Sequence, residues 1–228
     1  MTPILRPAAC FFDFDGTLMD TAPDIIGVLN EVLGDSGLPP LPLDRGLIGP
    51  PLEEIIAMAL PGLSQTEQDA IRLEYRARYR EHHYGNSRVF TGIIPLLHRL
   101  QAAGIPAFVA TNKPEAVSRR FLDIKGIAGL FRDVVSRDSL PGKALSKAEM
   151  LLMLTDRHGL ETSNCLMVGD SVLDMRGGRQ AGMKTAAALY GYTRREAMLA
   201  EEPDIIVEDE GWSEVRLWPS GEQTEVCP

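Results

Sequence analysis

The hydrophobic pattern of the chain alternates short apolar runs with helix-length amphipathic segments. The apolar runs have the length and composition of buried strands, and they lie at 8–12, 106–110, 134–135, 165–168, 185–189 and 205–207. Amphipathic helices are expected between several of them, at 93–103, 115–124 and 148–158. Alternation of this kind predicts an α/β fold, with a parallel sheet covered by helices on both faces.

One long segment breaks the alternation. Residues 19–87 contain helical patterns but no convincing strand, and stretches rich in glycine and proline interrupt these patterns. Because the segment begins directly after the first predicted strand, we expect it to be an inserted helical cap domain. The core domain would then consist of residues 1–18 and 88–228. We expect the polar tail after Gly211 to be loosely held.

Composition and charge exclude several classes of partner. The 228 residues are 44% hydrophobic and 24% charged, which is ordinary for a globular protein, and the formal net charge is −9. That charge repels nucleic acid and anionic membrane surfaces, and no run approaches the ~20 apolar residues of a membrane span. Cys10 and Cys165 lie in apolar runs, and Cys227 completes an odd number without a CxxC pair. We therefore expect a cytoplasmic protein without leader or anchor, whose cysteines are small buried hydrophobes rather than redox groups.

One stretch, residues 72–83, interleaves arginines with tyrosines and invites a nucleic-acid interpretation. Ile71, Tyr75 and Tyr79 recur there at helical spacing, however. We interpret the stretch as a cap helix that packs on these three side chains and presents a solvated basic face.

The first predicted strand runs directly into two aspartates, Asp13 and Asp15. Residues two apart in an extended chain face the same side, at ~3.3 Å per residue. Two like charges about 7 Å apart repel by roughly 2 kcal/mol at an effective dielectric constant of 20. A turn that caps a strand explains one aspartate but not both, so we assign this pair a functional role.

Polar residues also follow two later strands. Thr111 and Asn112 come before Pro114, which favours the first turn of a helix, so a hydroxyl and free backbone N–H groups would form an anion site. Asp170 ends another apolar run, and Asp174 follows one helical turn later on the same face. Each motif alone also suits an ordinary helix start.

A lysine is expected at the same place. Ser146 and Glu149 fit a capping box, which puts Lys147 in the first turn of a helix, where a cation is disfavoured unless anions are near. Ligands of open parallel sheets bind beyond the carboxyl ends of the strands, so all these groups should share one cleft. Hard carboxylate oxygens beside a phosphate suit Mg²⁺.

Taken together, these motifs resemble the haloacid dehalogenase-like hydrolase superfamily, and within it the phosphoglycolate phosphatase-like group. Residues 13–21 (DFDGTLMDT) are similar to its first motif, 109–113 (VATNK) to its second and 168–175 (VGDSVLDM) to its fourth. The phrases at 90–105 and 180–192 also resemble this group, so the similarity spans nearly the whole chain. It implies a Rossmann-like core with a helical cap, and a phosphatase acting on a small phosphorylated metabolite.

The resemblance also implies roles for single residues. Asp13 would attack phosphorus and form an aspartyl phosphate. Asp15 would protonate the leaving alkoxide and then take a proton from water. Thr111 and the backbone of Asn112 would hold the phosphoryl oxygens.

The implied cofactor is Mg²⁺, bound by Asp13, the carbonyl oxygen of Asp15 and Asp170. Asp174 would support the water shell of the metal or the lysine. For the lysine, Lys143 and Lys147 are both available, and neither is followed by proline, as it is in many relatives. We favour Lys147, because KAEML resembles a variant found with a GPPLE-like cap sequence, present at 49–53.

Several functions remain open. 2-Phosphoglycolate is the leading substrate by resemblance, with nucleoside monophosphates, as in 5'-nucleotidases, and sugar phosphates as further candidates. Arg45 and the turn at 49–51 are candidate specificity residues in the cap. A β-phosphoglucomutase-like isomerase would keep both aspartates, and a receiver-like signalling module would form an aspartyl phosphate without turnover. The acid at Asp15 separates the chain from dehalogenase-like and phosphonate-cleaving members, Thr17 favours a hydrolase over an isomerase, and the length of the chain argues against a signalling module.

Overall fold

The computed structural model describes residues 6–212, and its centre is a six-stranded parallel sheet. The strands are β1 (Ala9–Phe12), β4 (Ala107–Thr111), β5 (Asp133–Ser136), β6 (Cys165–Gly169), β7 (Lys184–Ala188) and β8 (Ile205–Val207), in the order β5-β4-β1-β6-β7-β8. The first strand therefore lies between β4 and β6, with Phe12 opposite Val109 and Val168. The polar residues that follow β1, β4 and β6 leave the sheet side by side.

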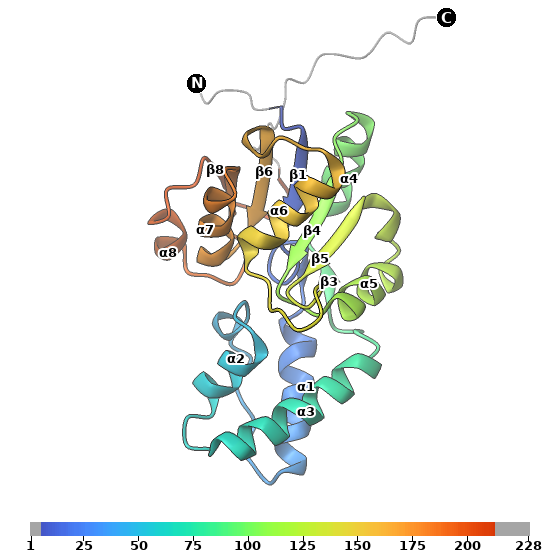
Figure 1. The fold of residues 1–228 in the computed structure, drawn as a ribbon. Coiled ribbons are helices and arrows are strands. Elements are labelled where there is room, and N and C mark those ends of the chain that lie inside the picture. Colours follow the sequence, from blue (N-terminus) through green and yellow to red (C-terminus); the bar gives the residue numbers. More distant parts are fainter. Residues whose placement is uncertain (1–5, 213–228) are drawn as a thin grey trace, which may run out of the picture.

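Both faces of the sheet are buried, which explains why its strands are continuous apolar runs. Alternate side chains of β1 belong to two separate clusters. Ala9 and Phe11 pack with α6 (Lys147–His158), whereas Cys10 and Phe12 pack with α4 (Ile93–Ala102) and α5 (Glu115–Ile124). Helices α7 (Val172–Gln180) and α8 (Arg195–Leu199) follow β6 and β7 (Figure 1).

The predicted sheet and helices agree closely with the structure. Each of the six predicted strands is present with ends within one residue of the prediction, and so are the three predicted helices. The predicted Rossmann-like α/β fold is confirmed. Cys10 and Cys165 are buried and not in a disulfide, as expected of small hydrophobes, whereas Cys227 lies outside the described residues.

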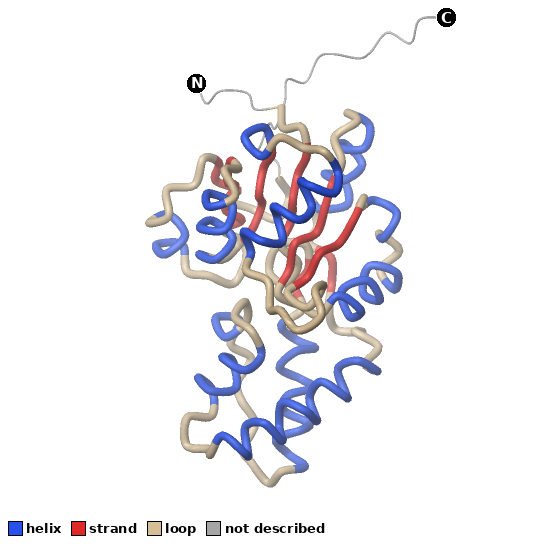
Figure 2. Tube along the Cα trace, viewed as in Figure 1, coloured by secondary structure: helices blue, strands red, loops and turns tan. Residues whose placement is uncertain are grey.

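A group of helices lies beyond the carboxyl ends of the strands, below the sheet in Figures 1 and 2. It contains α1 (Ala22–Asp35), α2 (Leu52–Ala59) and α3 (Gln65–Glu81), with a short 3-10 helix at Arg45–Leu47. Two-residue strands, β2 (Met19–Asp20) and β3 (Arg88–Val89), pair antiparallel where the chain leaves the core and returns to it. The expectation of no strand from residue 19 onward missed β2, because two residues are too short for a periodic pattern. The domain limits 19–87 and 88–228 stay a prediction.

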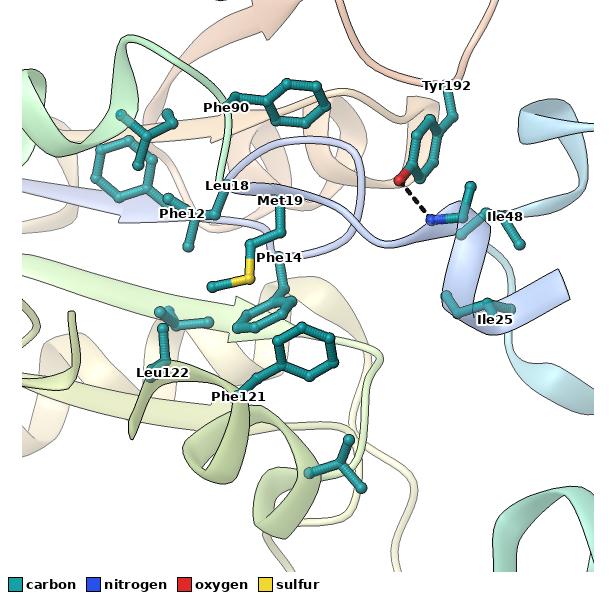
Figure 3. Packing of buried hydrophobic residues seen from close by; sticks show 14 of the residues in the cluster. Phe12, Phe14, Leu18, Met19, Ile25, Ile48, Phe90, Phe121, Leu122 and Tyr192 are labelled. Carbon is teal, nitrogen blue, oxygen red and sulfur yellow. Dashed lines mark hydrogen bonds between the residues drawn. The ribbon is translucent and has the colours of Figure 1, made fainter. Parts of the chain in front are cut away.

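Two buried polar contacts hold α1 in place, one to the core and one to the chain that returns to it. The hydroxyl of Tyr192 accepts hydrogen bonds from the backbone N–H of Thr21 at 2.7 Å and of Ala22 at 3.1 Å, where α1 begins (Figure 3). The Asp24 carboxylate, fully buried, accepts four hydrogen bonds from the backbone and side chains of Asn86 and Ser87. In the core, Phe14 and Phe121 pack edge to face with ring centroids 5.6 Å apart (Figure 3).

Two further predictions from the sequence concern membrane-spanning helices and the tail after Gly211. In the described part of the chain, no helix is both long and apolar enough to cross a membrane. Trp212 is buried, so the residue directly after Gly211 belongs to the packed structure. The rest of the predicted loose tail, from residue 213 on, lies outside the described residues.

We predict that Asp24→Ala lowers the free energy of unfolding by about 3 kcal/mol, because buried donors that lose a charged acceptor cost ~1–3 kcal/mol. Glu31→Ala on the exposed face of the same helix is the matched control and should change it by less than about 0.5 kcal/mol. Urea unfolding measures both. Equal stability of the two variants would show that the Asp24 contacts do not hold α1 to the returning chain.

Candidate active site

The predicted site residues converge at the carboxyl edge of the sheet. Asp13 follows β1 and its backbone N–H donates to the carbonyl of Val168 at 2.9 Å, so the strand pairing continues into the aspartate. Thr111 is the last residue of β4 on one side, and Asp170 follows β6 on the other. All three are at least nine-tenths buried. The parallel register is what brings them together.

Lys147 joins two of the carboxylates. Its Nζ lies 2.8 Å from Asp13 Oδ1, where it donates a hydrogen bond, and 2.7 Å from the carbonyl oxygen of Ala110. Asp174 Oδ1 lies 2.8 Å from the same nitrogen in an ion pair. The ammonium thus bridges the strand end of β1 and the first turn of α7.

The two candidate lysines lie in different surroundings. Ser146 and Glu149 form the predicted capping box, which starts α6 at Lys147 and turns this side chain inward. Gly177 of α7 makes room for it, since a β-carbon there would meet the Lys147 side chain at 2.6 Å. Lys143 instead pairs with Glu149 at 2.6 Å and is more than half exposed. Lys147, not Lys143, lies beside Asp13.

Asp170 is held in a tight polar pocket. Thr17 Oγ1 donates to its Oδ1 at 2.7 Å, and the backbone N–H of Tyr192 donates to its Oδ2 at 2.8 Å. The chain turns at Gly16 with φ +86°, and a β-carbon at that position would collide with the Asp170 carboxylate. Gly16 is therefore needed both for the turn after Asp15 and for the approach of Asp170.

Three carboxylates form a group that could hold a metal ion. Asp13, Asp170 and Asp174 each offer an oxygen, and these oxygens lie within 4.8 Å of one another. Asp174 Oδ2 is used by Ser171, which donates to it at 2.6 Å in a capping box, whereas Oδ1 is buried beside the Lys147 ammonium. Buried carboxylate oxygens that lie this close together are the type of ligand that a hard divalent cation or its water needs.

The pKa shifts in the cluster also favour a bound cation. Burial raises the pKa of Asp13 to about 7; Lys147 opposes this effect, and Asp174 adds to it. Burial also raises the pKa of Asp170 well above its usual value, helped by Asp13 and Asp174. For Lys147, burial alone would lower the pKa of the ammonium, but the two carboxylates outweigh it and raise the pKa. The cluster has more negative charge than one lysine neutralises.

Asp15 faces a different set of partners, which the sequence did not reveal. Its Oδ1 accepts a hydrogen bond from Thr21 at 2.5 Å and one from Lys113 Nζ at 2.9 Å. Lys113 also donates to the Tyr79 hydroxyl at 3.1 Å and lies over the rings of Phe14, Tyr79 and Phe121. Lys113 belongs to the VATNK motif, but only the folded arrangement shows that it joins Asp15 to α3.

The residues of the second motif are placed as follows. Thr111 Oγ1 accepts from the backbone N–H of Lys113 at 3.1 Å, and α5 begins directly after Pro114. The Asn112 side chain donates to the carbonyl of Gly49 at 3.3 Å, so it reaches the cap-side loop. No contact described for this chain tests the backbone roles predicted for Asn112 and for the carbonyl of Asp15.

A cavity of about 730 Å³ opens between α3, the loop at Gly49–Pro51 and the core. Asp15, Asn112 and Lys113 form part of its wall, so it leads to the catalytic candidates. Of the two candidate specificity elements, the turn at 49–51 lines this cavity. Arg45 instead pairs with Asp20 at 2.8 Å and is not among the lining residues.

Comparison with known proteins shows to which family the chain belongs. A family model described as haloacid dehalogenase-like hydrolase matches residues 10–188. The chain is 35% identical over 208 residues to N-acetylmuramic acid 6-phosphate phosphatase of Pseudomonas aeruginosa, covering 90% of this chain and 92% of that protein. It is 33% identical over 226 residues to phosphoglycolate phosphatase of Xylella fastidiosa, with 94% and 95% covered.

The fold has solved relatives as well. The crystal structure of a predicted phosphoglycolate phosphatase from Haemophilus somnus 129PT superposes with a TM-score of 0.83 at 26% identity, covering 92% of this chain and 97% of that one. The family and the enzyme class predicted from the sequence are confirmed. The chain therefore belongs to the haloacid dehalogenase-like hydrolases, and within them to the phosphatases.

Proposed function

We propose that the chain is a Mg²⁺-dependent phosphatase that hydrolyses a small phosphate monoester through an aspartyl phosphate on Asp13. The observation that carries the proposal is the meeting of Asp13, Asp170, Asp174 and Lys147 at one strand edge, with Asp15 two residues beyond the nucleophile. Such a concentration of buried acid has no role in holding a fold together. It suits a site where a cation and a phosphoryl group bind together.

The metal would be held by Asp13 and Asp170, with the carbonyl of Asp15 as a further ligand and Asp174 supporting its water. When bound, Mg²⁺ supplies positive charge that neutralises the carboxylates and the phosphoryl oxygens. The close approach of the three carboxylates and the raised pKa values of Asp13 and Asp170 fit this role.

In the first step, a carboxylate oxygen of Asp13 attacks phosphorus and the bond from phosphorus to the ester oxygen breaks. Asp15, protonated, gives its proton to the leaving alkoxide. Thr111 and the backbone N–H groups near Asn112 hold the phosphoryl oxygens, and Lys147 neutralises Asp13 and the incoming charge.

In the second step, water attacks the phosphorus of the aspartyl phosphate. Asp15, now a carboxylate, accepts the proton of that water, and inorganic phosphate leaves while Asp13 is regenerated. Because Asp15 acts first as an acid and then as a base, it must be held in one place through both steps. Lys113 and Thr21 provide this support, since both donate to its Oδ1.

2-Phosphoglycolate is the leading substrate, in line with the relative from Xylella fastidiosa. The size of the cavity favours a second candidate. About 730 Å³ falls in the ~300–1,000 Å³ range of sites that enclose whole drug-sized ligands, which is far more than a two-carbon ester fills. N-acetylmuramic acid 6-phosphate, named for the relative from Pseudomonas aeruginosa, is therefore the second candidate.

A nucleotidase, an isomerase and a signalling module are less well supported. A nucleotidase or a β-phosphoglucomutase-like isomerase would use the same acidic cluster, but the relatives from Pseudomonas aeruginosa and Xylella fastidiosa are phosphatases of different small esters. A signalling module needs no acid at Asp15 and no large cavity beside it. Helices α1–α3 act in this proposal as a cap over the site. The cytoplasmic location stays a prediction, with which two unlinked buried cysteines are compatible.

Asp13→Asn tests the proposal. We predict a loss of p-nitrophenyl phosphate turnover of about 10⁴-fold or more, because removing a nucleophile disables the whole mechanism. The exposed Asp123→Asn on α5 is the control and should keep wild-type turnover. Steady-state kinetics with Mg²⁺ measures both. Turnover by Asp13→Asn within tenfold of wild type would refute the aspartyl-phosphate mechanism.

Lys113→Met tests the support of Asp15. We predict that hydrolysis of an alkyl phosphate falls about 10–100-fold, because its alkoxide needs a well-placed proton donor. Hydrolysis of p-nitrophenyl phosphate should fall less than about threefold, since nitrophenolate leaves without that proton. Lys184→Met, which removes a surface ion pair with Asp204, is the control. Equal losses on both substrates would show that Lys113 does not act through the proton that Asp15 gives to the leaving alkoxide.

A further inference from the structure

The wall of the cavity on the α3 side is basic, although the chain carries a net charge of −9. Arg72, Arg76 and Arg80 follow one another at four-residue spacing on α3, and all three line the cavity. Side chains four apart lie on the same face of a helix, so the three guanidinium groups form one row. The sequence predicted a solvated basic face for this helix, but part of that face is turned toward the proposed active site.

Arg72 is the member of the row with a buried nitrogen that lacks a hydrogen-bond acceptor in the described part of the chain. Its side chain pairs with Asp69 at 3.0 Å, and its Nε is buried without a hydrogen-bond acceptor. A buried guanidinium nitrogen without an acceptor is unfavourable, and the planar fork of arginine matches the two oxygens of a carboxylate. Arg72 Nε therefore needs a hydrogen-bond acceptor that the described residues do not supply, such as a group of the substrate.

The charge balance of the cavity limits what that acceptor can be. Arg76 pairs with Glu53 at 3.4 Å, Lys113 with Asp15 and Lys143 with Glu149, whereas no acidic partner is described for the side chains of Arg80 and Arg137, which line the same cavity. The cavity therefore keeps positive charge for an anionic group of the substrate, and the free Nε of Arg72 suits a carboxylate oxygen. Tyr75, Ile55 and Pro50 add apolar surface to the same wall, which suits the body of a larger ester.

We propose that Arg72, assisted by Arg76, binds a carboxylate group that the substrate carries at a distance from its phosphate ester. This inference rests on the proposed phosphatase function and narrows its substrates to phosphorylated acid sugars and comparable esters. The phosphate would lie at Asp13, and the carboxylate would lie against α3 on the far side of the cavity. Arg72 is thus a specificity residue that takes no part in the chemical step.

A matched pair of ligands tests the proposal. N-acetylmuramic acid 6-phosphate and N-acetylglucosamine 6-phosphate share the phosphate position and differ by one carboxylate-bearing ether group. We expect wild type to favour the carboxylate-bearing ester in kcat/KM by about 10–100-fold, the range for one charged hydrogen-bonded contact. Arg72→Gln should remove most of this preference, mainly through KM, while p-nitrophenyl phosphate turnover stays within about threefold of wild type.

Arg78→Gln is the control on the same helix, because Arg78 pairs with Glu74 and Asp35 and does not line the cavity. It should keep the preference of wild type. A wild type without preference for the carboxylate, or a preference that survives in Arg72→Gln, would overturn the proposal.

Binding separates this inference from the proposed function. Calorimetry on Asp13→Asn, with and without Arg72→Gln, measures the affinity for both esters without turnover. Arg72-dependent binding of the carboxylate-bearing ester supports the site even if wild type hydrolyses no ester, an outcome that would refute only the phosphatase proposal. Tighter Arg72-dependent binding of glucose 1,6-bisphosphate than of the carboxylate-bearing ester would overturn the assignment to a carboxylate.

Discussion

The buried contact of Lys147 with Asp13 and Asp174 is the interaction on which the site depends. It joins the end of β1, the start of α6 and the first turn of α7, three segments that are far apart in the sequence. Burying an ammonium and two carboxylates is costly, and a single lysine does not balance the third carboxylate of Asp170. The arrangement is possible because adjacent parallel strands of the sheet end at the same edge. Its cost is explained by the proposed phosphatase function, which needs these charges.

Much of the core could be predicted because its physical signals are local. Strands buried on both faces are continuous apolar runs, so their positions are visible in the sequence, and the capping boxes at Ser146 and Ser171 mark two helix starts. Asp13, Asp170 and Lys147 could be assigned to one site because each follows a strand or opens a helix. Their placement at one edge of a parallel sheet follows from general rules of this fold.

The features that escaped prediction depend on contacts between distant segments. Lys113 joins Asp15 to Tyr79, a pairing that no spacing in the sequence reveals. The periodicity of α3 shows which side packs, through Ile71, Tyr75 and Tyr79, but not that the adjacent row of arginines faces a cavity. Arg45 was a specificity candidate because of its position in the predicted cap. Its side chain instead forms an ion pair with Asp20, at the start of the helical segment. Side chains of α3 therefore reach the site in two ways, through Tyr79 near the acid and through the arginine row near the far end of the cavity.

The central claim is that the acidic cluster is tolerable because a divalent cation binds within it. Chemical unfolding of wild type and Asp170→Asn, each in Mg²⁺ and in a chelator, tests this claim directly. The account predicts that Mg²⁺ stabilises wild type but not the variant, and that without metal the variant is the more stable of the two, since one repelling charge is gone. A wild type whose stability is the same with and without Mg²⁺, and higher than that of Asp170→Asn in the chelator, would contradict it.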